Sequence, residues 1–172
     1  MNMLGMMLKE STATARMGSY RFRKTERDME SNLCEPQEPA TVLIVDDDVT
    51  IQLTFSALLW QEGYRIVVAA SADEARARLD QIQPDVILCD LLMTGTNGDE
   101  FWSWLKEHAS WRFVPVIAIT RIDHPVAVAG MLDAGADAVV VKPVSGSDLR
   151  ARVAAALRTR RRYVDLMRNA CR

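Results

Sequence analysis

The chain has 172 residues, of which 49% are hydrophobic and 26% charged, and its formal net charge is −2; these values are typical of a globular protein with a substantial core. No apolar run approaches the roughly 18 residues that cross a bilayer, and the first residues lack the pattern of a secretory signal, so we expect a cytoplasmic protein without a membrane partner. The three cysteines have no metal-type spacing and the two histidines lie far apart, which argues against a zinc site and against a histidine-based catalytic triad.

The first segment, residues 1–40, mixes Met, Ser, Thr and charged residues without a sustained hydrophobic period. It ends in the proline-bearing stretch CEPQEPA, which is typical of a linker. We therefore expect residues 1–40 to be a largely disordered extension. Met29 is an alternative translation start, so the sequence leaves open whether residues 1–28 are translated in the cell.

A regular alternation of strand and helix patterns begins at Thr41. Continuous apolar runs such as TVLIV, typical of strands covered on both faces, predict strands over residues 41–45, 65–69, 85–89, 114–120 and 137–141. Apolar residues at helical spacing, as in Ile51, Phe55 and Leu59, predict helices near residues 51–63, 71–82, 98–108, 125–134 and 147–162. Because parallel strands need crossover connections, this order predicts an α/β fold: a doubly wound, five-stranded parallel sheet with five helices. Residues 41–162 then form one domain, and residues 163–172 a C-terminal tail.

Polar side chains follow four of the five predicted strands. Asp46 and Asp47 follow the first strand, Asp90 the third, Thr120 the fourth and Lys142 the fifth. Because the carboxyl ends of parallel strands meet at one edge of a sheet, we expect these residues to share a pocket. Carboxylates held this close need a cation, and oxygen ligands suit Mg²⁺ where phosphate is handled. A lysine and a threonine beside them can hold phosphoryl oxygens while an aspartate attacks and forms an acyl phosphate.

Four motifs in this order, IVDDD, DVILCDLLMTGTNGDEF, VPVIAIT and GADAVVVKP, carry a family resemblance. From about residue 40 to residue 160 the chain resembles the receiver domain of bacterial two-component response regulators, a flavodoxin-like fold. The resemblance implies that Asp90 accepts the phosphoryl group and that Asp46, Asp47, Asp90 and the backbone carbonyl of Leu92 bind Mg²⁺. It leaves Asp48 as the solvated member of the acidic trio.

The resemblance also implies roles for residues after the fourth and fifth strands. Thr120 would bond a phosphoryl oxygen and move on activation, and Lys142 would pair with the phosphoryl group beside a cis bond to Pro143. The family carries out self-catalysed phosphorylation and dephosphorylation and is not a conventional enzyme. The implied donor is a histidine kinase or a histidine phosphotransfer protein. The implied output is an unknown partner protein that reads the face formed by helix 125–134, the fifth strand and the last helix, with a homodimer as a further hypothesis.

The sequence departs from the family pattern near the switch residues. Arg121 stands where a small residue usually follows the threonine, and a long cation there either obstructs the phosphodonor or attracts it. Val139 replaces the aromatic switch residue, so a coupled rotation with Thr120 cannot work in its usual form. These departures favour a first alternative, a receiver-like module that binds partners without being phosphorylated.

A second alternative is a phosphatase of the haloacid-dehalogenase type. The stretch from Asp46 to Thr50 fits the D-x-D-x-T loop of those enzymes. They need a further acidic pair on a strand after the lysine, whereas only Asp148 and Asp165 follow Lys142, in the predicted last helix and tail. This interpretation also leaves Asp90 without a task.

The basic stretch RTRRR at residues 158–162 raises the question of a nucleic-acid partner. Neither a recognition helix nor a zinc spacing follows it, and only ten residues remain. Cations are favourable at a helix C-terminus, so we interpret the stretch as a solvated helix end and expect no nucleic-acid partner. It contributes to an uneven charge layout, with a net charge of −8 over residues 41–146 and +6 over residues 147–172.

Overall fold

The structure, a computed structural model, describes residues 38–93 and 98–170. The sequence predictions for residues 1–37 therefore lie outside the described part of the chain. The strands are β1 (Thr41–Val45), β2 (Arg65–Ala69), β3 (Val86–Asp90), β4 (Val116–Thr120) and β5 (Ala138–Val141). The helices are α2 (Val49–Trp60), α3 (Ala72–Ile82), α4 (Gly98–Glu107), α5 (Pro125–Asp133) and α6 (Gly146–Ala170). None of the described helices is long and apolar enough to cross a membrane.

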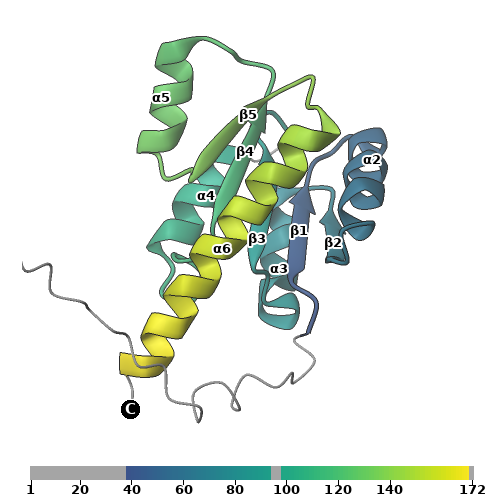
Figure 1. Cartoon of the computed structure of the whole chain (residues 1–172). Coiled ribbons are helices and arrows are strands. Elements are labelled where there is room, and N and C mark those ends of the chain that lie inside the picture. The colour runs from purple at the N-terminus through teal and green to yellow at the C-terminus, as the bar shows by residue number, and fades with distance from the viewer. Residues whose placement is uncertain (1–37, 94–97, 171–172) are drawn as a thin grey trace, which may run out of the picture. The chain divides into compact units, whose positions relative to one another are not determined.

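The five strands form one parallel sheet in the order β2-β1-β3-β4-β5; α2, α3, α4 and α5 connect successive strands, and α6 follows β5 (Figure 1). The predicted fold class, an α/β doubly wound flavodoxin-like sheet, is confirmed. The chain moves outward from β1 to β2 and then returns past β1 to β3, so the strand order reverses between β1 and β3. In open parallel sheets, ligands bind beyond the carboxyl ends of the strands at such a switch point.

Two apolar layers cover the two faces of the sheet. Side chains alternate along β1, where Val42 and Ile44 pack with Phe55 of α2 and Leu149 of α6. On the opposite face, Leu43 packs in the layer that includes buried residues of α3, α4 and α5. Strands buried on both faces explain why the sequence shows continuous apolar runs instead of alternation.

Side chains that cap the first turns fix the starts of α2 and α3. The Asp48 carboxylate accepts hydrogen bonds from the amides of Thr50 at 2.8 Å and Ile51 at 3.4 Å, so it is the N-cap of α2. The sequence interpretation of Asp48 as a merely solvated acid missed this role. Ser71 caps α3 by accepting a hydrogen bond from the amide of Glu74 at 3.1 Å.

The last helix is longer than the sequence analysis predicted. We expected it to end near residue 162 and to be followed by a tail, but α6 continues to Ala170. Residues 163–170 contain neither glycine nor proline, so nothing local ends the helix. The Tyr163 ring also stacks on Phe113, with 4.3 Å between the ring centroids, which anchors this extension to the body of the domain.

Candidate functional site

The strand ends bring the predicted polar residues to one edge of the sheet. Asp46 follows β1, Asp90 ends β3 and Thr120 ends β4; their exposed fractions are only 1%, 7% and 0%. Asp46, Asp47 and Asp90 each contribute one carboxylate oxygen to a cluster in which these three oxygens lie within 4.8 Å of one another. The predicted convergence of these three acids is therefore present in the structure.

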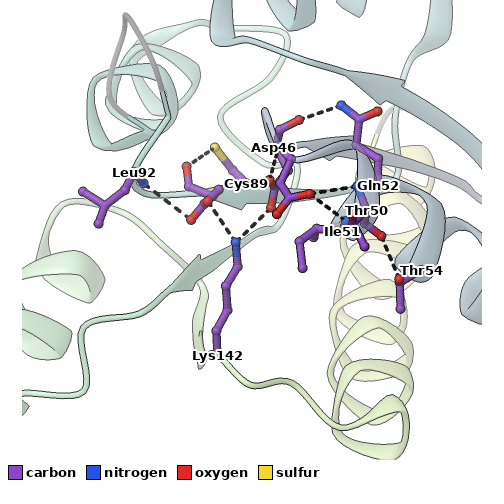
Figure 2. A network of polar contacts seen from close by, with 10 residues as sticks. Asp46, Thr50, Ile51, Gln52, Thr54, Cys89, Leu92 and Lys142 are labelled. Carbon is purple, nitrogen blue, oxygen red and sulfur yellow. Dashed lines mark hydrogen bonds and ion pairs between the residues drawn. The ribbon is translucent and has the colours of Figure 1, made fainter.

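Lys142 supplies a positive charge between two of these acids. Its Nζ donates to Asp90 Oδ2 at 2.9 Å and to Asp46 Oδ2 at 3.1 Å. Figure 2 shows the Lys142 side chain extending toward Asp46 and the neighbouring carboxylate. Burial alone would lower the pKa of Lys142, but the hydrogen bonds to Asp90 and Asp46 outweigh burial and raise that pKa. The lysine is thus held in its charged form.

Hydrogen bonds fix the orientation of Asp46. Its Oδ1 accepts from the amide of Asp48 at 2.9 Å, and its backbone carbonyl accepts from Gln52 Nε2 at 2.6 Å (Figure 2). Burial raises the pKa of Asp46 above its ordinary value, although the Asp48 amide and Lys142 oppose that effect. Gln52 was not predicted from the sequence, because a glutamine on a helix carries no signal until its distance from a strand end is known.

The acidic cluster suits a hard divalent cation. Three carboxylates close together provide the oxygen ligands that Mg²⁺ prefers. The ion pairs of Lys142 with Asp46 and Asp90 show that these carboxylates stabilise a positive charge. Leu92, whose carbonyl the resemblance assigns to the metal, lies two residues after Asp90. The Leu92 amide donates a long hydrogen bond to Asp90 Oδ1 at 3.5 Å.

The remaining predicted residues lie on β4 and β5 or directly after these strands. The buried Thr120 hydroxyl accepts a hydrogen bond from the amide of Ile122 at 3.0 Å, and Arg121 is exposed. The peptide bond between Lys142 and Pro143 is cis, the geometry that the resemblance implies. Val139 of β5 is half-buried, and the register pairs it with Ala118 of β4.

Gly98 allows the start of α4 to approach the Asp90 backbone. Its amide donates to the Leu91 carbonyl at 3.0 Å. A Cβ atom at this position would lie 2.1 Å from the Asp90 carbonyl oxygen, so no larger residue fits without a backbone shift. Gly98 lies within the second of the four family motifs, but no role for it was predicted from the sequence. The close approach of the Asp90 backbone thus explains why the motif after β3 has a glycine at position 98.

The sequence matches a protein family model and is similar to curated regulatory proteins of known name. The family model described as response regulator receiver domain matches residues 42–154. The sensory transduction protein RegX3 of Mycobacterium tuberculosis is 35% identical over 118 residues, which cover 69% of this chain and 51% of that protein. The phosphate regulon transcriptional regulatory protein PhoB of Escherichia coli is also 35% identical, over 68% of this chain and 51% of its own length. The chain therefore spans about half the length of these curated relatives.

Solved structures show the same fold. The chemotaxis protein CheY4 of Vibrio cholerae superposes with a TM-score of 0.65 at 29% identity, over 69% of this chain and 98% of that one. The signal receiver domain of a signal transduction histidine kinase from Syntrophus aciditrophicus superposes with a TM-score of 0.64 at 31% identity, over 69% of this chain and 89% of that one.

Proposed function

The chain belongs to the response regulator receiver domain family, and from this premise we propose that it is the phosphoacceptor of a two-component phosphorelay, with Asp90 as the acceptor. One observation carries the proposal: Asp90 lies in a single cluster with Asp46, Asp47 and Lys142. We assign this function to residues 41–162, with residues 1–40 as an extension outside the functional unit, and place it in the cytoplasm.

The arrangement suits in-line transfer from a phosphohistidine. An Asp90 carboxylate oxygen attacks the phosphorus, a P–O bond forms, and the P–N bond to the donor imidazole breaks; the imidazole leaves with the electron pair and takes up a proton. Lys142 is positioned to exchange its contact with Asp90 for one with a phosphoryl oxygen. Thr120 would donate its hydroxyl to another phosphoryl oxygen, and water attacking the acyl phosphate would reverse the modification.

Mg²⁺ would be held by Asp46, Asp47, Asp90 and the Leu92 carbonyl. When bound, it would neutralise the negative charge that gathers between the aspartates and the incoming phosphoryl group. Asp46 is already oriented for this role by the Asp48 amide and by Gln52. Asp46 therefore needs little rearrangement to accept the metal, whereas Lys142 would have to give up its contacts with Asp46 and Asp90.

An exposed apolar stripe on α2 is suited to docking the donor. Val49, Leu53 and Trp60 are 62%, 67% and 73% exposed, and their spacing places them on one side of the helix. The stripe begins directly after Asp48, beside the acidic cluster. A helical surface of a histidine kinase or phosphotransfer protein packed on this stripe would bring its phosphohistidine to the rim of the site.

The output would pass through the face formed by α5, β5 and α6. Val126 and Leu132 of α5 are 73% and 45% exposed, and apolar surface of this kind favours a protein partner or a second copy of the chain. Val139 lacks an aromatic ring, so movement of Thr120 would reach this face without a coupled ring rotation. We expect neither nucleic acid nor a membrane to be the partner of residues 41–162.

A second function, partner binding without phosphorylation, is favoured by Arg121 and Val139 alone. The phosphatase alternative loses support, because the family match covers the acidic loop and the chain lacks the additional acidic pair.

Intact mass after incubation with acetyl phosphate tests the proposal. We expect a Mg²⁺-dependent gain of one phosphoryl group in the wild type and none in Asp90→Asn, which keeps the size of the side chain. A wild type that gains no mass from acetyl phosphate or from a cognate kinase would instead support the phosphorylation-independent module. Labelling of Asp90→Asn equal to the wild type would show that another residue is the acceptor.

A further inference from the structure

A cavity of about 490 Å³ lies against the middle of α6, where residues between 152 and 163 line it, away from the acidic cluster. It opens at the start of β4 and β5, where Pro115 and Ala138 lie, whereas Asp90 and Thr120 stand at the opposite, carboxyl ends of the strands. Its charged lining consists of Lys106, Arg112, Asp137, Arg152 and Arg160. We call it the basic cavity.

Small side chains on α6 create the basic cavity. The buried positions Leu149, Val153 and Leu157 hold α6 against the sheet. Beside them, Ala155 and Ala156 face the cavity and leave space. Figure 1 shows α6 crossing the sheet and continuing past it; the cavity lies along the middle of this helix, beside the starts of β4 and β5.

Two of the four cations at the basic cavity are already compensated. Lys106 Nζ pairs with Asp137 Oδ2 at 2.7 Å, and Arg152 Nε pairs with Asp148 Oδ1 at 3.0 Å. Within residues 38–93 and 98–170, no carboxylate lies within ion-pair distance of the other two lining arginines, Arg112 and Arg160. The basic cavity therefore carries two uncompensated positive charges.

The Arg160 guanidinium includes an N–H donor without a hydrogen-bond partner among the described residues. Its Nη1 donates to the Phe113 carbonyl at 3.3 Å, and its buried Nε is the donor that these residues leave unpartnered. A buried donor without a partner is unfavourable, and an anion that draws the Arg160 guanidinium into the cavity would bring Nε into contact with it and remove that penalty. The Arg112 guanidinium lies 4.6 Å from the centre of the Phe113 ring, which places both free arginines around the same residue.

We propose that the basic cavity binds a phosphate monoester whose organic part is ring-shaped or apolar. A phosphate monoester carries about −1.5 to −2 charges at neutral pH, which matches two arginines, and guanidinium groups bind phosphate oxygens in pairs. Ile117, Ala138 and Ala156 provide an apolar wall for the organic part. The volume lies within the range of small-molecule sites, about 300–1,000 Å³. This binding is independent of phosphorylation at Asp90.

Chemical-shift mapping on the ¹⁵N-labelled full chain, without Mg²⁺, tests this proposal. The probes are phenyl phosphate, inorganic phosphate and phenol. We expect saturable shifts at Phe113, Ala138 and Thr159 with phenyl phosphate, with a Kd of about 1 mM or tighter. Binding of phenyl phosphate should be at least about tenfold tighter than binding of either part alone, because the charge and the apolar wall act on the same ligand.

The double variant Arg112→Gln/Arg160→Gln should weaken phenyl phosphate binding at least about tenfold. The matched control is Arg158→Gln/Arg162→Gln, which removes the same charge from exposed positions of α6 outside the cavity lining and should leave the Kd unchanged. Thermal unfolding of both variants reports whether they fold.

Several outcomes would overturn the proposal. Equal weakening in both double variants would mean that only the general charge of α6 attracts the anion. Shifts confined to the amides around Asp90 and Lys142 would place the anion in the acidic-cluster site. No saturation by phenyl phosphate, or equal affinity for inorganic phosphate, would remove the basis for a site that recognises an organic phosphate. If the Arg112→Gln/Arg160→Gln variant is unfolded, Arg112→Lys/Arg160→Lys replaces it, and unchanged binding there would also count against guanidinium recognition.

Discussion

Lys142 bridges two carboxylates that come from different strands: its Nζ lies 2.9 Å from Asp90 Oδ2 and 3.1 Å from Asp46 Oδ2. The side chains of all three residues are at most 10% exposed, so the interaction is only weakly screened by water. In the proposed reaction the same ammonium must turn toward a phosphoryl oxygen, and a metal must take over the charge of the aspartates.

The first prediction concerns removal of this cation. Lys142→Met should lower the free energy of unfolding by about 3 kcal/mol in the absence of divalent ions, because it leaves buried carboxylates without a partner. Mg²⁺ should then stabilise the variant more than the wild type, since the ion no longer competes with the ammonium. Urea unfolding with and without Mg²⁺ measures both effects.

Lys106→Met is the matched control. Lys106 pairs with Asp137 at 2.7 Å, but Asp137 is 49% exposed, so this loss should cost only about 1 kcal/mol or less and be insensitive to Mg²⁺. Equal losses in the two variants would contradict a special role for the buried bridge.

The second prediction is the pH dependence of the difference in unfolding free energy between the wild type and Lys142→Met. The pKa of Lys142 is raised above 10.5 in the folded chain, so the folded state holds this proton more tightly than the unfolded state. The contribution is therefore complete below about pH 10.5 and is lost as the pH rises through the raised pKa. The gap in unfolding free energy between wild type and Lys142→Met should shrink above about pH 10.5, whereas a constant gap would contradict the charge-based explanation. Chemical denaturation at a series of pH values measures it.

The third prediction concerns the space at the start of α4. Gly98→Ala would place a Cβ atom 2.1 Å from the Asp90 carbonyl oxygen, so the backbone at the acceptor must shift. We expect a loss of about 1–3 kcal/mol in unfolding free energy and slower phosphorylation by acetyl phosphate. Gly130→Ala in α5 is the control: its Cβ would meet nothing within 4 Å, and the change should stabilise the chain by about 0.5–1 kcal/mol. An unaffected phosphorylation rate in Gly98→Ala would show that the loop tolerates the shift.

The sequence was sufficient to place Asp46, Asp90 and Lys142 together, because parallel strands deliver their next residues to one edge and the apolar runs mark where each strand ends. It was insufficient for Gln52 and for the charges around Phe113, whose roles depend on distances between segments. The end of α6 was also missed: an Arg-rich stretch resembles a helix end, but the stacking of Tyr163 on Phe113 is a tertiary contact without a local signal.

The fourth prediction tests donor docking on α2. Leu53→Glu and Trp60→Glu place charges on the exposed stripe, so transfer from a cognate kinase should slow at least tenfold, the effect of about 1.4 kcal/mol in binding. Phosphorylation by acetyl phosphate should be unchanged, because the small donor needs no docking surface. Leu132→Glu on α5 is the matched control, with normal transfer expected from both donors. Slower transfer in Leu132→Glu alone would move the docking surface to α5.

The fifth prediction decides between the two roles of Arg121. Arg121 is exposed and follows the buried Thr120, and no carboxylate among the described residues neutralises it. An exposed cation at the rim of an acidic pocket attracts an anionic phosphodonor, and this attraction is screened by salt. Arg121→Gln should therefore slow phosphorylation by acetyl phosphate several-fold at low ionic strength, with the difference disappearing near 1 M salt, where the Debye length is about 3 Å.

Arg161→Gln removes the same charge from an exposed site on α6 and controls for net charge. If the Arg121→Gln variant is instead phosphorylated faster at every salt concentration, the side chain obstructs the donor by its size. That result would make Arg121 a steric brake on this receiver.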